Sequence, residues 1–292
     1  MSRSHAQRGF RISDLSRLTP VPHKHQATRF LRGSLLLFLV CSSVCFAQRQ
    51  NEPRPAPLDP VQAEQEARAL VAEMLAQKPD QNTTNSGSVR IRDAAGKTRE
   101  IPVRFEIFLT PTNWMSAYEI LPSAGEPGGL KLTVVHSGDQ PNCYKLFDPA
   151  AATNAVTRKL SPDQMMTPFA GSDFWIADLG LEFLHWPKQR LLKREMRHSK
   201  SCNVLESVNP APVPGGYARV VSWIMIESPH GIVHADAFNA QGEVLKRFDP
   251  KNLEKVQGEY QVEEIEMRNR KTGSETVIKF NLANNPPSEA AR

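Results

Sequence analysis

The sequence has none of the short motifs that mark the common catalytic centres. It contains no Gly-x-Ser-x-Gly elbow, no His-Glu-x-x-His pair, no phosphate-binding glycine loop and no Cys-x-x-Cys pair. Each of these motifs sets reactive groups at the spacing that its chemistry needs. Internal repeats, low-complexity arrays and runs of like charge are missing as well. The sequence therefore predicts a protein that is not an enzyme and that holds no cofactor or metal ion.

The sequence also lacks an apolar run long enough to span a membrane. Its longest, residues 33–45, has about 13 residues, whereas a helix needs ~20 to cross the hydrocarbon core. Two arginines precede this run and small residues follow it, which is the pattern of a secretory signal peptide. We therefore expect residues 1–47 to be a cleavable signal peptide that ends at Ala47, and the mature protein to lie in the periplasm. A membrane-tethered lipoprotein, acylated at Cys41 or Cys45, is the less favoured alternative because valine precedes each cysteine.

The mature chain has little net charge. The whole sequence has a formal charge of +5, but residues 1–47 hold seven of the basic residues and one of the acidic residues. Their removal leaves 29 basic and 30 acidic residues. The high isoelectric point therefore does not indicate a nucleic-acid partner, and we expect none.

Cysteine is scarce in the mature chain. Two of the four cysteines lie in the predicted signal peptide, so only Cys143 and Cys202 remain. A disulfide can persist in an exported protein. The sequence spacing does not fix the Cα separation that a bridge requires. A disulfide between Cys143 and Cys202 and two separate buried thiols therefore both stay open.

The remaining sequence changes pattern twice. Residues 48–60 are rich in proline and poor in bulky apolar residues, which is typical of a linker. Asp59 and Pro60 have the residue types preferred at a helix start, and apolar residues then recur at helical spacing as far as Lys78. The sequence therefore predicts one domain over residues 61–285 that opens with an amphipathic helix, followed by a disordered tail over 286–292.

After Gly87 the sequence alternates with the period of β-strands. Gly and Asn residues join neighbouring segments closely, which favours antiparallel hairpins over parallel crossovers. One helical insert, between residues 161 and 186, interrupts the pattern. The expected strands are 88–93, 99–110, 113–121, 130–137, 142–148, 189–198, 202–208, 216–228, 232–239, 243–249, 260–269 and 274–282.

Four pieces of sequence follow one another in a recognisable order. They are Phe169-Ala-Gly-Ser-Asp-Phe174 leading into Asp178-Leu179, then Tyr217 to Trp223, then Gly242-Glu-Val-Leu-Lys246, and finally Asn269 to Thr276 with Gly273 between them. This succession resembles the outer-membrane lipoprotein-sorting (LolA-like) family. The resemblance implies a mainly β (α+β) fold, an open, strongly curved antiparallel half-barrel covered by short helices.

The resemblance also implies a function. Such a protein would carry lipoprotein acyl chains or other lipids between envelope membranes without covalent chemistry, with an inner-membrane transporter as a further candidate partner. The alternative is an envelope scaffold or adaptor that binds a protein through the same curved sheet and has a filled core. An empty apolar groove beneath residues 161–186 would favour the carrier, and a solid interior would favour the adaptor.

An acyl-chain carrier needs apolar side chains that face a cavity instead of a filled core. Along residues 217–226 both faces of the expected strand are apolar, so one face can form a cavity wall. Aromatic and methionine side chains supply large, adaptable surfaces. Each candidate also fits an ordinary core. The candidate lining residues are Phe105, Ile107, Trp114, Met115, Phe174, Trp175, Phe183, Trp186, Val221, Trp223 and Met225.

Two pairs of polar residues could support other chemistry. His230 and His234 are four residues apart, but on a strand that spacing separates them by about 13 Å at ~3.3 Å per residue, so we expect surface histidines. Asp173 and Asp178 could form a carboxylate pair. We expect Asp173 instead to be a helix N-cap.

Overall fold

The computed structural model describes residues 59–125, 127–151, 156–256 and 259–281. The predicted signal peptide, nearly all of the predicted linker and the predicted tail lie outside the described residues and stay predictions. Among the described residues, no helix is both long enough and apolar enough to cross a membrane.

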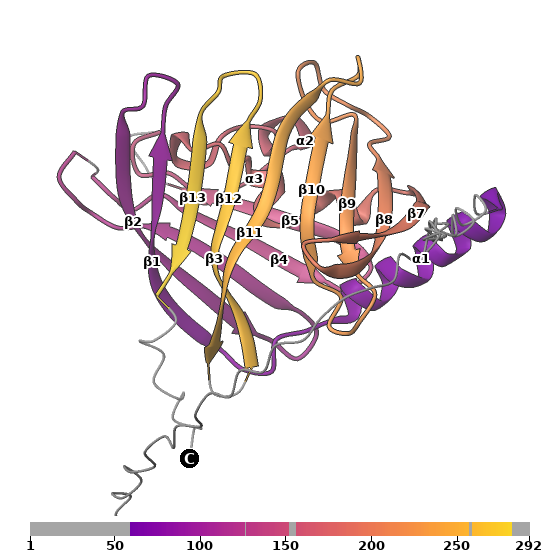
Figure 1. Ribbon diagram of the computed structural model, residues 1–292. Coiled ribbons are helices and arrows are strands. Elements are labelled where there is room, and N and C mark those ends of the chain that lie inside the picture. Colours follow the sequence, from indigo (N-terminus) through magenta and orange to yellow (C-terminus); the bar gives the residue numbers. More distant parts are fainter. Residues whose placement is uncertain (1–58, 126, 152–155, 257–258, 282–292) are drawn as a thin grey trace, which may run out of the picture. The chain divides into compact units, whose positions relative to one another are not determined.

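The described residues form one antiparallel sheet with a few helices (Figure 1). The elements in chain order are α1 (Pro60–Ala76), β1 (Thr83–Arg92), β2 (Thr98–Leu109), β3 (Trp114–Ile120), β4 (Lys131–Ser137), β5 (Gln140–Phe147), β6 (Arg158–Lys159), α2 (Pro162–Met165), η1 (Phe169–Gly171), α3 (Ile176–Leu179), η2 (Glu182–His185), β7 (Lys188–Arg197), β8 (Lys200–Val208), β9 (Arg219–Met225), β10 (Ile232–Phe238), β11 (Val244–Val256), β12 (Glu259–Asn269) and β13 (Glu275–Phe280). All twelve expected segments are strands, and the short helices fall within the expected insert.

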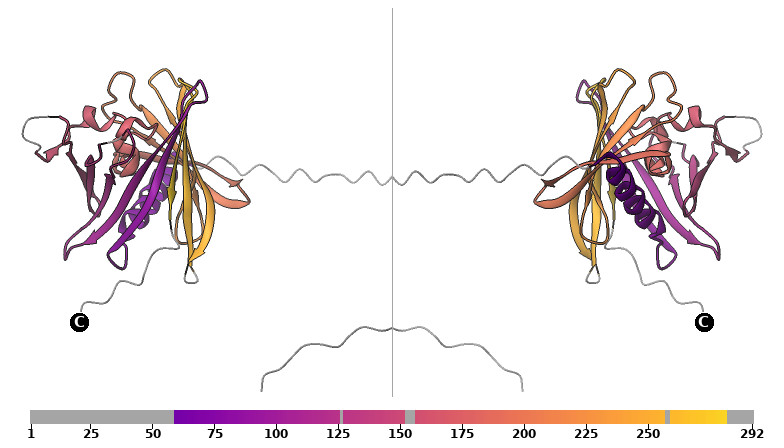
Figure 2. Two further views of the ribbon diagram at one scale, coloured as in Figure 1. Left: turned by 90° about the vertical axis from the view of Figure 1, so that its left-hand side faces the viewer. Right: turned by 90° about the vertical axis from the view of Figure 1, so that its right-hand side faces the viewer.

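The sheet is open at both edges, and in its middle the first strand of the chain pairs with the last. The 13 strands follow the order β6-β5-β4-β3-β2-β1-β13-β12-β11-β10-β9-β8-β7, so β6 and β7 are the free edges. β1 pairs with β13, with Val89 opposite Ile278. Seen from the side, the sheet bends so that its two halves flank α1 and the insert, residues 161–186 (Figure 2). The prediction of an open, curved antiparallel half-barrel is confirmed.

Helix α1 forms where the sequence predicts it. The Asp59 carboxylate accepts hydrogen bonds from the backbone N–H groups of Val61 and Gln62 at 3.0 and 3.1 Å, which satisfies donors that a helix start leaves free. Its buried face packs against η2 and β7 to β10 in a cluster that includes Trp186, Leu191 and Leu205. The helix thereby covers part of the concave side.

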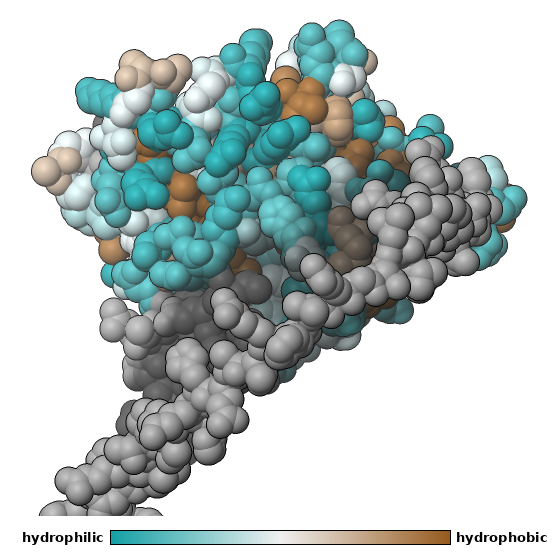
Figure 3. Space-filling model, in the orientation of Figure 1, coloured by the Kyte–Doolittle hydropathy of each residue, from teal (hydrophilic) through white to brown (hydrophobic). Residues whose placement is uncertain are grey.

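The two faces of the sheet differ in polarity. The concave face carries two clusters of buried apolar side chains, one around β1 to β5 and the insert, the other around α1 and β7 to β10. The convex face over β11, β12 and β13 is mainly hydrophilic (Figure 3). Ion pairs there join neighbouring strands, such as Arg247 with Asp236 at 3.0 Å. This one-sided pattern is typical of an antiparallel sheet with one solvated face.

Two strands are longer than the sequence predicts. β1 begins at Thr83 rather than at residue 88, so Gly87, expected to precede the strand, lies within it. A Cβ at position 87 would lie 2.0 Å from the Lys279 carbonyl oxygen and 2.8 Å from the Phe105 ring. The glycine therefore permits a close approach inside the sheet. β11 continues past Pro250 to Val256 because its pairing with β10 extends only to Phe248, so the missing N–H of Pro250 leaves no gap in that ladder.

Replacing Gly87 with alanine should destabilise the protein. The new methyl group would collide with the Lys279 carbonyl and the Phe105 ring, and overpacking of this kind costs about 1–3 kcal/mol of unfolding free energy. Urea denaturation followed by circular dichroism measures the loss. Ser88→Ala, on the next and partly exposed position, is the control and should change stability by less than about 0.5 kcal/mol. Equal stability of the two variants would contradict the close approach.

Candidate functional site

A cavity of about 410 Å³ lies on the concave side of the sheet. Its walls come from the end of α1, strands β1 to β5, the insert, and strands β11 to β13. Most of its lining is apolar and includes Phe105, Ile107, Leu181, Phe248 and Phe280. The volume falls within the ~300–1,000 Å³ of small-molecule sites. The interior is therefore not filled by the protein's own side chains.

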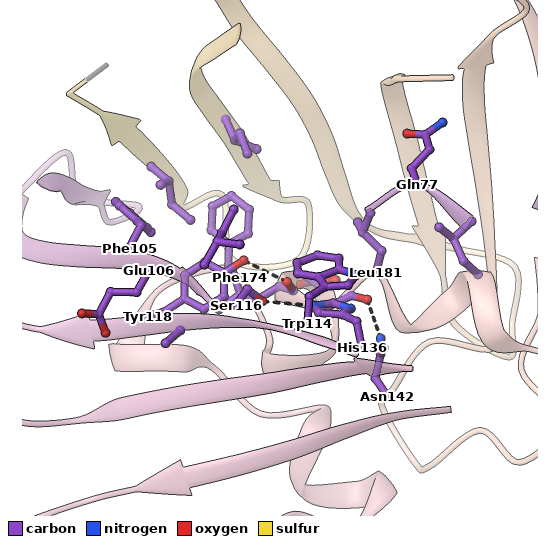
Figure 4. A pocket seen from close by; sticks show the side chains of 18 of the residues that line it. Gln77, Phe105, Glu106, Trp114, Ser116, Tyr118, His136, Asn142, Phe174 and Leu181 are labelled. Atoms are coloured by element: carbon purple, nitrogen blue, oxygen red, sulfur yellow. Dashed lines mark hydrogen bonds between the residues drawn. The ribbon is translucent and has the colours of Figure 1, made fainter. Parts of the chain in front are cut away.

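Strand alternation decides which side chains reach the cavity. On β3, Trp114, Ser116 and Tyr118 line it and the small Ala117 between them contributes as well, whereas Met115 does not line it because successive side chains point to opposite faces. The Trp114 ring stacks on the His136 ring with centroids 3.8 Å apart. The Tyr118 hydroxyl donates a hydrogen bond to the Leu179 carbonyl at 3.0 Å. This bond ties β3 to the insert (Figure 4).

The structure brings four of the expected lining residues to the cavity. They are Phe105, Ile107, Trp114 and Phe174. A fifth, Phe183, lies instead at a small hollow of about 30 Å³ that also contacts Lys246.

The other six expected lining residues do not line the cavity. Met115 faces the convex side. On β9 the inward positions belong to Val220 and Ile224, which lie in the concave cluster. Sequence could not distinguish the two faces of β9 because both are apolar. The alternation of β9 places three of the expected lining residues on its other face, namely Val221, Trp223 and Met225.

The two remaining tryptophans have packing roles. Trp186 is buried in the cluster beneath α1. Trp175 stacks on Tyr217 with ring centroids 4.5 Å apart and covers the ammonium group of Lys246 at 3.7 Å. Both tryptophans therefore help to hold the insert in place.

The two cysteines of the described domain are free thiols. Cys143 is half-buried on β5 and Cys202 is buried on β8, and these strands lie next to opposite edges of the sheet. The possible disulfide is therefore not formed, and the alternative of two separate thiols describes the structure.

Asp173 holds the insert to the far end of the chain. Its carboxylate accepts hydrogen bonds from the hydroxyls of Ser274 at 2.6 Å and Thr276 at 2.8 Å. Its backbone N–H donates to the Thr276 hydroxyl at 2.9 Å. The prediction that Asp173 is a helix N-cap is therefore wrong. Asp173 is a buried link between the insert and β13.

Lys246 completes this link from β11. Its ammonium group, with the side chain 2% exposed, donates to the Asp173 carbonyl at 2.5 Å and lies 3.8 Å from the Asp178 carboxylate. Burial lowers the pKa of Lys246 to about 8, although Asp178 and Asp173 oppose this shift. We call Asp173, Asp178, Lys246 and Thr276 the insert anchor.

Asp178 takes the capping role that was expected of Asp173. Its carboxylate accepts hydrogen bonds from the Trp175 backbone N–H at 2.7 Å and the Tyr217 hydroxyl at 3.1 Å. Burial raises the pKa of Asp178, while Lys246 lowers it. Because each carboxylate already has several partners, the insert anchor has a structural role. The sequence pieces that carry the family resemblance all contribute to it.

Removing the Thr276 hydroxyl should loosen the insert anchor. Thr276→Val keeps the side-chain shape but leaves the buried Asp173 carboxylate and N–H each short of a partner. An unsatisfied buried group costs about 1–3 kcal/mol, so the free energy of unfolding in urea should fall by about that amount. Thr276→Ser keeps the hydroxyl and should retain most of the stability. Equal losses in the two variants would contradict the hydrogen-bonding role.

The expectation of surface histidines is wrong for His234. This residue is 1% exposed, and its Nδ1 lies 2.6 Å from an Asp249 carboxylate oxygen. Burial lowers the pKa of His234, but Asp236 and Asp249 outweigh burial and raise it. His230 lies 2.9 Å from Glu73 of α1. Among the residues that the structure describes, no group of His, Cys, Asp and Glu is arranged to hold a metal ion.

Polar side chains gather on one side of the cavity, and no pattern in the sequence indicates them. His136 bonds to the Ser116 hydroxyl at 3.1 Å, and Asn142 donates to the Gly180 carbonyl at 2.8 Å (Figure 4). Burial lowers the pKa of His136 to about 4, with a further contribution from His185. These residues stand singly in the sequence, so only the fold brings them together.

Glu182, in η2, lies close to this side of the cavity. Burial raises the pKa of Glu182 to about 7, although Tyr144 opposes the shift. A carboxyl whose pKa is raised on folding favours the folded state below about pH 4.5, and this contribution is lost as the pH rises through 7.

Glu182→Gln should therefore make stability less dependent on pH. The glutamine stays neutral, so the free energy of unfolding of the variant relative to wild type should be higher at pH 8 than at pH 5. Urea titrations at the two pH values measure the difference. If the difference in unfolding free energy between the variant and wild type is the same at pH 5 and pH 8, the fold does not hold Glu182 neutral.

Solved structures share this fold. A putative outer-membrane lipoprotein-sorting protein domain from Vibrio parahaemolyticus is 16% identical, with a TM-score of 0.64 over 78% of this chain and 95% of that one. A DUF1329 family protein from Desulfovibrio piger is 19% identical, with a TM-score of 0.62 over 80% and 96%. A LolA superfamily protein from Nitrosomonas europaea is 18% identical, with a TM-score of 0.51 over 75% and 91%.

Sequence comparison adds a family. No curated protein matches the chain significantly. More than half of the chain, residues 127–285, matches the model of a family described as "Uncharacterized protein". The chain therefore belongs to this family, and its fold is LolA-like, as the solved structures show.

Proposed function

We propose that this protein is a non-catalytic carrier or binding protein that holds the acyl chains of a lipoprotein or another lipid in its concave cavity. The observation that carries this proposal is the apolar cavity of about 410 Å³ beneath the insert. An unfilled apolar space of this size is costly to keep in a protein interior unless something binds in it.

Apolar burial supplies the affinity. Each CH₂ group that moves from water into the cavity contributes about 0.8 kcal/mol. The lining supports this because aromatic and aliphatic side chains from the sheet, α1 and the insert all contact the same space. The insert anchor supports binding without covalent chemistry, because the carboxylates of Asp173 and Asp178 already accept hydrogen bonds within the protein.

The place of action that we propose is the periplasm. The signal-peptide pattern of residues 1–47 supports export. The Vibrio structure with a similar fold is described as a "putative outer membrane lipoprotein-sorting protein domain", which supports a lipid or lipoprotein as cargo. We propose an inner-membrane transporter as the partner that supplies this cargo. A protein-binding scaffold with a solid interior is less well supported, because the interior contains the cavity.

Native mass spectrometry tests the proposal directly. Protein expressed with its own N-terminal segment and purified by mild extraction should carry lipid. After delipidation it should bind a neutral apolar dye, such as N-phenyl-1-naphthylamine, with a rise in fluorescence that added lipid reverses. The carrier proposal would be contradicted if the purified protein never carries lipid and does not bind the dye.

Filling the cavity should weaken binding without unfolding the protein. Ile107→Trp places a larger side chain on the lining, and we expect dye affinity to fall at least about tenfold, equivalent to ~1.4 kcal/mol. Phe108→Trp is the matched control, because this neighbouring side chain is 37% exposed and faces away. It should leave dye binding unchanged. Equal binding by the two variants would place the dye elsewhere.

A further inference from the structure

The hairpin that joins β7 to β8 concentrates basic side chains in a domain with little net charge. Six of the 13 residues from Lys188 to Lys200 are lysine or arginine, and one is acidic. Three of the six are neutralised in ion pairs, namely Arg190 with Glu206, Lys193 with Glu195 and Arg194 with Glu66. Lys188, Arg197 and Lys200 form no ion pair with any residue that the structure describes.

Two of these three cations face each other at the turn. Arg197 and Lys200 are direct partners in the register of β7 and β8. The two residues between them, His198 and Ser199, both have positive φ, 49° and 61°, which is the backbone of a tight hairpin turn. Like charges directly opposite each other destabilise a pair of strands. An anion bound at this turn would relieve the repulsion.

Two large apolar side chains are exposed beside these cations. Met196 is 63% exposed and Ile226 is 40% exposed. Both lie next to Ser201, whose hydroxyl donates to the Met196 sulfur at 3.2 Å and whose carbonyl accepts from the Ile226 backbone N–H at 2.9 Å. We call Met196, Arg197, Lys200 and Ile226 the hairpin tip.

The acids beside the hairpin tip do not neutralise it. Glu195 already bonds to the Lys193 ammonium group and to the Trp223 indole N–H. Glu227 follows Ile226 and is exposed, so water screens its charge. The hairpin tip therefore combines excess positive charge with apolar surface, which is the composition of segments that bind anionic membranes.

The shape of the hairpin tip fits a membrane better than a protein. In both views of Figure 2 the β7–β8 hairpin projects beyond the neighbouring strands. A projecting tip with two apolar side chains cannot bury the ~800 Å² per partner of a stable protein interface. It can place Met196 and Ile226 among lipid head groups while Arg197 and Lys200 contact phosphates.

We propose that the hairpin tip docks the protein on a membrane surface that carries anionic lipid head groups. This proposal goes beyond the carrier function, because none of the four residues of the hairpin tip lines the cavity. Docking would hold the carrier close to the bilayer with which it exchanges lipid.

Flotation with lipid vesicles tests the proposal. The vesicles consist of phosphatidylcholine alone, or of equal parts of phosphatidylcholine and anionic phosphatidylglycerol. Protein expressed with its own N-terminal segment should bind the anionic vesicles at least about tenfold more tightly than the neutral ones. Salt at 1 M should release it, because the Debye length then falls to ~3 Å.

Two double variants assign the binding to the hairpin tip. Arg197→Gln with Lys200→Gln should weaken binding to the anionic vesicles about tenfold or more. Arg270→Gln with Lys271→Gln is the matched control, because it removes the same charge from exposed positions in the turn between β12 and β13. It should change the affinity less than about twofold. All variants share one N-terminal segment, so differences between them come from the substituted turns.

A third variant tests the apolar part of the hairpin tip. Met196→Ser removes an exposed apolar side chain and should weaken binding to the anionic vesicles at least about threefold. Circular dichroism shows that each variant is folded.

The outcomes separate docking from the carrier function, because dye binding measures the cavity independently. Equal binding to both kinds of vesicle, or equal losses in the two double variants, overturns the proposal. Protein that binds the dye but no vesicle overturns docking and leaves the carrier function intact. Protein that binds vesicles through the hairpin tip but neither dye nor lipid supports docking and contradicts the carrier function.

Discussion

The position of the insert depends on one buried ammonium group. Lys246 Nζ reaches from β11 to the Asp173 carbonyl, lies near the Asp178 carboxylate, and is covered by the Trp175 ring. A buried charge without these partners would be strongly destabilising. The backbone of the insert and the side chains of Asp173 and Asp178 therefore have to stay close to the Lys246 ammonium group. Since Phe174 and residues 178–181 line the cavity, the same contacts set the position of its roof.

The insert and α1, which both contribute to the cavity walls, are held by different kinds of contact. The insert is fixed by buried polar contacts that are costly to break. Helix α1, which contributes Met74 and Leu75 to the lining, is bound to the sheet through apolar packing and two polar contacts. These are an ion pair between Glu66 and Arg194 and a hydrogen bond between Glu73 and His230. Exposed pairs of this kind contribute little. Displacing the end of α1 therefore costs less than displacing the insert.

The sequence predicted the strands well because apolar alternation and turn residues are local signals. It predicted β1 and β11 too short, because Gly87 and Pro250 usually end strands and only the neighbouring strands make them tolerable. It could not assign faces on β9, where both sets of side chains are apolar. The roles of Asp173 and Asn142 depend on partners far away in the chain, which no local pattern contains. The family resemblance located the insert anchor rather than the binding surface.

The pairing of β1 with β13 in the middle of the sheet has a consequence for how the protein is made. β1 has only β2 as a neighbour until residues 275–280 exist, since its second ladder is formed by the last strand. Asp173 likewise lacks its hydroxyl partners until Ser274 and Thr276 follow. Folds that rely on such distant contacts form slowly. A partly synthesised chain therefore cannot complete its sheet. This delay suits the export that we propose, because a translocation channel admits an unfolded chain.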